Sequence, residues 1–150
     1  MHCVFAVKYR EAVIHSSWEE ELHKYSTGII QNNSHKLIAI NSATDHIHAF
    51  IGLNSKQSIS ELMRLVKGDI SELINRKKLT KTKFQWQEGY GAFSNSYSQI
   101  NDVVKYITNQ KEHHHKKTFL EEYNTMLKAY AVAYNESYIF HEPLQELMVG

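Results

Sequence analysis

Short apolar segments alternate with longer amphipathic ones along the first half of the chain. The short segments are rich in β-branched or aromatic residues, which predicts β-strands at residues 3–7, 36–40 and 46–53. The last two are joined by a short connection, so we expect them to pair antiparallel. Between the first two, Ser16 or Ser17 is expected to cap a helix that opens at Trp18 and runs to about Gln31.

The rest of the chain is predicted to be mainly helical. Ser58 is expected to cap a long helix whose apolar residues recur at three- and four-residue spacing: Ile59, Leu62, Met63, Val66, Ile70, Leu73 and Ile74. Residues 84–93 are aromatic and punctuated by glycine, which indicates a strand plus a loop. Two further helices are expected to begin at Ser98 and Thr118.

The order of these elements predicts the fold class. Strand, helix, strand, strand, helix, strand and two helices is a ferredoxin-like pattern: an α+β fold with an antiparallel sheet, helices packed on it and C-terminal helical additions. The chain has one proline, few glycines and neither a linker nor a repeat, so residues 1–150 are predicted to form a single domain. Such a fold hosts many functions, so the function must be argued from particular residues.

Composition narrows the class of protein. The formal net charge is +1, which excludes a strongly basic protein but leaves room for a local basic face. Cys3 is the sole cysteine, so no intramolecular disulfide can form, which favours a reducing compartment. No apolar run approaches the roughly 20 residues of a membrane span, and the N-terminus lacks the pattern of a secretion signal. We therefore expect a cytoplasmic protein with no membrane partner.

Two histidines on a predicted strand are the first candidates for chemistry. Residues two apart on a strand point to the same face, so His46 and His48 are expected to lie side by side, with Ile47 turned into the core. Two imidazoles form a compact platform for a divalent metal ion. The spacing alone is weak evidence, because the chain holds ten histidines and a second such pair, His113 and His115.

Tyr106 and Gln110 are the second pair of candidates. They lie four residues apart on a predicted helix, so they share a face one turn apart. A tyrosine hydroxyl can attack a phosphodiester and hold the strand as an ester, and a glutamine carbonyl oxygen can complete a metal site with two histidines. The alternative is that Tyr106, one of nine tyrosines, simply packs at a helix boundary.

Basic and aromatic residues gather in the middle of the chain. One stretch that contains only two acids holds seven basic residues: Arg64, Lys67, Arg76, Lys77, Lys78, Lys81 and Lys83. These residues are suited to binding phosphates, or else they form a solvated helix face and loop. The aromatic residues Trp86, Tyr90, Phe93 and Tyr97 follow, and they are suited to stacking on unpaired bases. For Trp86 and Phe93 core packing is the favoured interpretation.

Taken together, these segments resemble the single-tyrosine transposases of the HUH superfamily, the insertion sequence 200/605 family. The motif of histidine, hydrophobic residue and histidine is residues 46–48, preceded by Asp45. Residues 4–10 look like the family's first strand and basic turn, and residues 86–94 look like its aromatic, glycine-rich segment. Residues 103–110 look like the helix that carries the nucleophile. The resemblance covers about residues 3–130, in the family's order.

The resemblance implies a DNA transposase that cleaves and rejoins single-stranded DNA at hairpin-bearing ends through a 5′-phosphotyrosine. It assigns Tyr106 as the nucleophile and His46, His48 and Gln110 as ligands of Mg²⁺ or Mn²⁺. It also implies a homodimer with active sites shared between subunits. DNA contacts are expected from eight residues: Lys8, Arg10, Arg64, Lys67, Lys77, Lys78, Tyr90 and Lys105.

Two alternatives keep the same fold. A domesticated relative would nick repeated hairpins in its host genome, with the same chemistry. A non-catalytic ferredoxin-like module would only bind nucleic acid. The presence of Tyr106, His46, His48 and Gln110 together counts against this last alternative.

Overall fold

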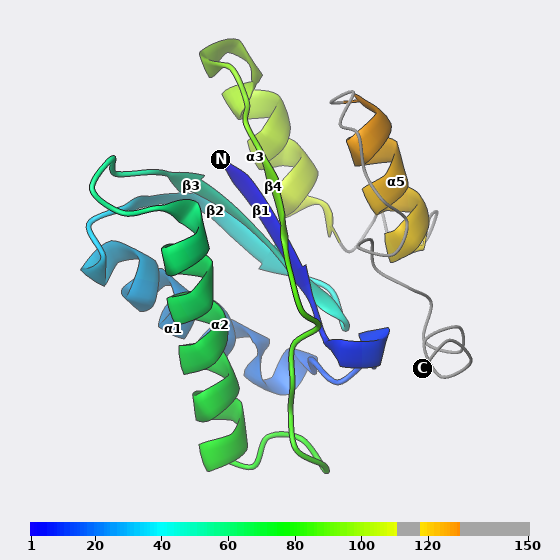
Figure 1. Cartoon of the computed structure of the whole chain (residues 1–150). Coiled ribbons are helices and arrows are strands. Elements are labelled where there is room, and N and C mark those ends of the chain that lie inside the picture. Colours follow the sequence, from blue (N-terminus) through cyan, green and yellow to red (C-terminus); the bar gives the residue numbers. More distant parts are fainter. Residues whose placement is uncertain (111–117, 130–150) are drawn as a thin grey trace.

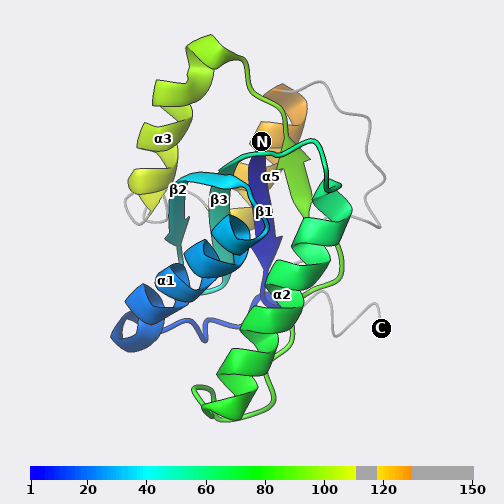
Figure 2. The same cartoon turned by 90° about the vertical axis from the view of Figure 1, so that its left-hand side faces the viewer.

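A four-stranded sheet with helices on both of its faces forms the centre of the protein (Figures 1 and 2). The computed structural model describes residues 1–110 and 118–129. In chain order the elements are β1 (His2–Ala6), the 3-10 turn η1 (Lys8–Arg10), α1 (Ser16–Asn32), β2 (Lys36–Ser42), β3 (His46–Gly52), α2 (Ile59–Arg76), β4 (Gly91–Phe93), the 3-10 turn η2 (Tyr97–Gln99), α3 (Ile100–Thr108) and α5 (Phe119–Ala129). The second histidine pair, residues 113 and 115, lies outside the described residues.

The strand order in the sheet is β2-β3-β1-β4, and every neighbouring pair is antiparallel. Combined with the chain order β1-α1-β2-β3-α2-β4, this is the ferredoxin-like arrangement, so the predicted α+β fold class is confirmed. Strands β1 and β3 are the two inner strands. Their register places Val4 opposite His48 and Ala6 opposite His46. Side chains that alternate along these two strands therefore face two different layers.

One face of the sheet packs against α1 and α2, which lie together on the same side (Figure 2). The strand side chains of this core come from alternate positions of β1 and β3: Cys3, Phe5, Ile47, Ala49 and Ile51. The apolar stripe of α2 meets them, and each of its residues from Leu62 to Ile74 is buried. The predicted helical spacing of this stripe is therefore confirmed, and the face is sealed from solvent.

The opposite face is covered in part by α5, which Figure 1 shows on the other side of the sheet from α1 and α2. A second apolar cluster joins β1 and β4 to this helix: Val4, Ala6, Phe93, Phe119, Tyr123 and Leu127. Gly91 lets the helix approach closely, because a Cβ atom there would lie 2.5 Å from the Tyr123 hydroxyl. Helix α3 joins the same side, where the Asn41 side chain of β2 donates a hydrogen bond to the Ile107 carbonyl.

The start of α1 differs from the prediction. Its N-cap is His15, whose side chain makes no capping bond, and both Ser16 and Ser17 already lie within the helix. Tertiary contacts fix this entry instead: Ile14 is buried, and its backbone N–H donates to the Thr44 carbonyl at 2.9 Å. Capping preference was overridden because the buried anchor decides where the chain can turn.

Of two further predicted helix starts, one is confirmed and one is displaced. Ser58 caps α2 as expected, since its hydroxyl accepts a hydrogen bond from a backbone N–H three residues later. The expected start at Ser98 is displaced, because Ser96 and Gln99 form a capping box around η2 and α3 begins only at Ile100. None of the helices within residues 1–110 and 118–129 is long and apolar enough to cross a membrane.

Candidate active site

The inner strand β3 carries the histidine pair. His46 and His48 are fully buried on the sheet face that α5 covers, while Ile47 between them points into the α1 and α2 core. The two imidazole centroids are 5.0 Å apart and the rings are inclined at 71°. This is the side-by-side arrangement that the two-residue period of a strand dictates.

Each histidine is held at its Nδ1 atom by a neighbouring side chain. The Nδ1 atom of His46 lies 2.7 Å from a carboxylate oxygen of Asp45. The Nδ1 atom of His48 lies 2.7 Å from the Nε2 atom of His2, at the start of β1. Both Nε2 atoms then face oxygen atoms: that of His46 lies 3.3 Å from Gln110 Oε1, and that of His48 lies 3.2 Å from a carboxylate oxygen of Glu122.

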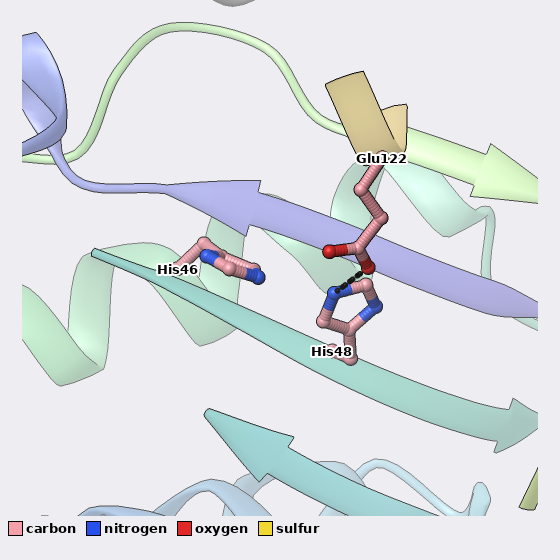
Figure 3. A group of neighbouring side chains, drawn as sticks. All are labelled: His46, His48 and Glu122. Atoms are coloured by element: carbon pink, nitrogen blue, oxygen red, sulfur yellow. Dashed lines mark ion pairs between the residues drawn. The ribbon is translucent and has the colours of Figure 1, made fainter. Parts of the chain in front are cut away.

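Glu122 of α5 joins the strand histidines to the tyrosine helix. Figure 3 shows its carboxylate reaching toward His48. The same carboxylate accepts hydrogen bonds from the Tyr106 hydroxyl and, at 2.9 Å, from the Gln110 side-chain amide. His46, His48 and Glu122 each offer a ligand atom, and these atoms all lie within 4.8 Å of one another. Two imidazoles and a carboxylate are a suitable donor set for a divalent metal ion.

Glu122 was not predicted from the sequence, although a signal was present. It lies three residues after Phe119 and four before Met126, so on a helix it falls within the apolar stripe. An acidic residue within such a stripe is costly to bury unless it is paired. The tyrosine and glutamine were predicted on one helix, but α3 ends at Thr108 and Gln110 lies just beyond it.

The electrostatics of the site follow from this burial. Burial raises the pKa of the Tyr106 hydroxyl well above its usual range, and the neighbouring Glu122 charge raises it further. Burial alone would raise the pKa of Glu122, but hydrogen bonds and charge from His48, with hydrogen bonds from Tyr106 and Gln110, hold that pKa well below its usual range. Glu122 is therefore an anion beside a neutral tyrosine at neutral pH.

Helix α5 also covers the histidines with an aromatic ring. Phe119 stacks on His46 with ring centroids 4.1 Å apart and planes 5° from parallel. Arg10 lies on Phe119, with its guanidinium carbon 5.2 Å from the ring centroid, and is itself buried. Arg10 was expected to contact DNA, but in this structure it is a packing partner of α5.

The other expected DNA contacts are spread over both faces of the molecule. Lys105 is exposed on α3 next to Tyr106, and Lys8 of η1 donates a hydrogen bond to the Gln85 side chain at 3.2 Å. Lys67 is half-buried and donates hydrogen bonds to the carbonyls of Gln87 and Gly89, so it holds the loop that leads into β4.

Three more basic residues belong to α2 or the turn after it. Arg64 pairs with Glu61, Lys77 pairs with Glu21, and Lys78 is exposed. These residues belong to the layer on the sheet face opposite the histidines. Tyr90 packs against the same core as α2, with its hydroxyl 3.3 Å from that of Ser60. The structure therefore does not bring the basic stretch and the histidine pair together.

Fold and site together define an α+β protein in which a histidine pair on an inner strand faces a tyrosine from a separate helix. The model of the IS200-like transposase family matches residues 1–110, so the chain belongs to that family. No curated protein matches the chain.

Two solved structures share the fold. The crystal structure of a candidate transposase from Deinococcus radiodurans R1 is 22% identical, with a TM-score of 0.59 over 73% of this chain and 88% of that chain. The structure of a REP-associated tyrosine transposase bound to a REP hairpin is 16% identical, with a TM-score of 0.57 over 75% of this chain and 66% of that chain. At these identities the likeness is one of fold.

Proposed function

We propose that this transposase cleaves and rejoins single-stranded DNA at hairpin-bearing ends, with Tyr106 as the nucleophile. The proposal is based on three side chains that contact one carboxylate. The Tyr106 hydroxyl, the His48 ring and the Gln110 amide all contact the Glu122 carboxylate. These residues come from three separate segments: β3, α5, and α3 with the residues just after it. Few structural needs bring a tyrosine hydroxyl, a histidine pair and a buried anion to one place, whereas metal-assisted phosphoryl transfer to tyrosine can use each of these groups.

In the proposed reaction the Tyr106 oxygen attacks a backbone phosphorus, and the bond from that phosphorus to the 3′ oxygen breaks. The strand is then held as a 5′-phosphotyrosine. The tyrosine hydroxyl loses one proton and the released 3′ oxygen takes up one, so the protons balance. A 3′-hydroxyl from another end attacks the ester and frees the tyrosine, so one phosphodiester is exchanged for another. The energy of the bond is conserved in the ester, and no nucleotide cofactor is required.

The donor set of the site fits Mg²⁺ or Mn²⁺. His46 and His48 would hold the ion through their Nε2 atoms, because both Nδ1 atoms are engaged with Asp45 and His2. Gln110 remains our proposed oxygen ligand, and Glu122 joins it as a second candidate. When bound, such an ion polarises the scissile phosphate and neutralises its charge.

The DNA partner is proposed to carry a hairpin next to the cleaved single strand. The REP-associated transposase that shares the fold is bound to a REP hairpin, which supports this choice. Lys105 is exposed on α3 next to Tyr106, and Lys8 lies in η1 directly after the inner strand β1, so these two residues are our first candidates for phosphate contacts.

A homodimer is also proposed, as the resemblance to the family implies. Sharing of active sites between subunits would require the tyrosine helix to be exchanged. Tyr106 lies against His48 of its own chain, with ring centroids 5.9 Å apart, and in the proposed dimer the same contact would form between subunits. A domesticated relative that nicks host hairpins would use the same residues. Genomic neighbourhood separates the two, because a mobile element recurs between hairpin-forming ends.

A covalent adduct tests the proposed nucleophile. The protein is incubated with Mg²⁺ and labelled single strands copied from both flanks of its gene, and the products are run on a denaturing gel. Tyr106→Phe removes only the hydroxyl and is expected to abolish both cleavage and the adduct. Tyr90→Phe and Tyr97→Phe are matched controls and should still form the adduct. A covalent band that persists in Tyr106→Phe would show that another residue is the nucleophile.

A further inference from the structure

His2 is the residue behind the histidine pair. It begins β1, is 3% exposed, and lies on the same sheet face as His48. In the register of β1 and β3, Val4 is opposite His48 and His2 is opposite Phe50, so His2 and His48 are diagonal neighbours. Their ring centroids are 5.0 Å apart, and the His2 Nε2 atom lies 2.7 Å from the His48 Nδ1 atom.

The hydrogen bond between these two rings has two possible directions. If His48 carries its proton on Nδ1, it donates to His2, and its Nε2 lone pair can bind a metal ion. If His2 donates instead, the neutral His48 carries its proton on Nε2, where it blocks metal binding and points at Glu122. The direction of this one bond therefore decides whether His48 can act as a ligand.

We propose that His2 is a positioning residue that accepts a hydrogen bond from His48 Nδ1 and thereby holds the His48 Nε2 atom ready for the metal ion. This inference rests on the proposed function, because it presupposes that His48 is a ligand. It gives the two ligands equivalent supports: His46 is held at Nδ1 by Asp45, and His48 is held at Nδ1 by His2. Partners of this kind fix the tautomer and the orientation of a ligating ring.

An imidazole suits this position better than a carboxylate does. His2 is enclosed by His48, Tyr106 and Phe93, whose ring centroids lie 5.0, 6.1 and 6.2 Å from its own. An imidazole can accept a hydrogen bond without carrying a negative charge, so it orients His48 without adding a second buried anion near the place where a phosphate must bind.

Metal affinity measured without DNA tests the role directly. Wild type, His2→Leu, His2→Gln and His46→Ala are titrated with Mn²⁺, and the free ion is followed by electron paramagnetic resonance. His2→Leu is expected to lower Mn²⁺ affinity by about 10–100-fold, the usual effect of losing the partner of a ligating histidine. His2→Gln keeps an acceptor oxygen at similar reach and should restore affinity to within a few-fold of wild type.

The outcomes separate this inference from the proposed function. Unchanged affinity in His46→Ala would overturn the metal site itself. If His46→Ala loses Mn²⁺ while His2→Leu binds as wild type, the positioning role is wrong and the metal site stands. Equal losses in His2→Leu and His2→Gln would also overturn it, because a purely steric role would then explain both.

A second measurement uses only the wild-type protein, so it does not depend on whether a variant folds. In the wild type loaded with diamagnetic Mg²⁺, histidine nitrogen NMR shifts should show a protonated Nδ1 on His48 and an unprotonated Nε2 on His2. The reverse pattern, with the proton on His2 Nε2, would contradict the proposal.

Discussion

The hydroxyl of Tyr106 donates a hydrogen bond to the Glu122 carboxylate, and the same carboxylate contacts His48 on strand β3. A residue of α5 thus links the helix that carries the tyrosine to the strand that carries the histidines. Helix α5 has two roles in this arrangement: it supplies a buried anion to the site, and with Phe119 it covers His46. Both strand histidines are fully buried, so the proposed reaction requires this cover to move.

Loss of either strand histidine is expected to separate cleavage from binding. His46→Ala and His48→Ala should each abolish cleavage of a hairpin-bearing single strand, because each removes a nitrogen ligand. Hairpin affinity should stay within a few-fold of wild type, since both side chains are fully buried and offer no surface to the hairpin. Gel shift and cleavage, measured on the same samples, check this, and full cleavage by both variants would remove the metal assignment.

Glu122 is expected to contribute to metal affinity. Glu122→Gln keeps the size and hydrogen-bonding capacity of the side chain but removes its charge, so Mn²⁺ affinity should fall by about tenfold or more, the scale seen for groups that support a metal site. Glu121→Gln is the matched control, because Glu121 precedes it on α5 but is exposed. Isothermal titration without DNA provides the affinity. Equal affinities in the two variants would leave Gln110 as the oxygen ligand and exclude Glu122.

The docking of α5 should depend on Gly91. Gly91→Ala places a Cβ atom 2.5 Å from the Tyr123 hydroxyl and 2.8 Å from its ring, so the buried Tyr123 side chain, and with it the packing of α5, must shift. Overpacking of this kind costs about 1–3 kcal/mol of stability and should speed hydrogen exchange in α5. Gly68→Ala in α2 is the control, since nothing lies within 4 Å of its added Cβ and the change favours helix. If the two variants unfold at the same denaturant concentration, the close contact is not limiting.

Alkaline pH should destabilise the protein partly through Cys3. Burial raises the pKa of this thiol from its ordinary value of 9.0 to about 12. Between these values the unfolded chain has lost the proton that the folded chain keeps, so the contribution of Cys3 to stability is intact below pH 9 and declines as pH rises toward 12. The slope is about 1.4 kcal/mol per pH unit for one such group. Urea unfolding of wild type and Cys3→Ala at pH 8 and 10 measures it, and parallel losses in both proteins would contradict the assignment.

The fold and half of the site follow from local rules in the sequence. Strand periodicity places His46 and His48 on one face, and the helical stripe of α2 is buried as its spacing predicts. Glu122 and His2 are different, because their roles depend on contacts with residues 74 and 46 positions away along the chain. No local pattern encodes such pairings.

The basic residues show the same limit. The sequence predicts Arg10 as a DNA contact. In the structure Tyr9 and Arg10 take left-handed backbone angles, with φ of 58° and 50°. The turn they form brings the guanidinium group against Phe119, where it is buried. Likewise, charge clustering along α2 says nothing about which face of the sheet the helix covers. The sequence shows which residues are basic, whereas the contacts of each basic side chain depend on the tertiary structure.

The parallel stacking of Phe119 on His46 also gives the molecule an intrinsic spectroscopic reporter. With the two centroids 4.1 Å apart, the imidazole lies above the face of the phenyl ring, where the circulating π electrons shield nearby nuclei. The carbon-bound protons of His46 therefore resonate upfield of those of a solvent-exposed histidine while α5 is docked, and they return downfield when the helix leaves. A one-dimensional proton spectrum can thus count the fraction of molecules with an uncovered histidine pair.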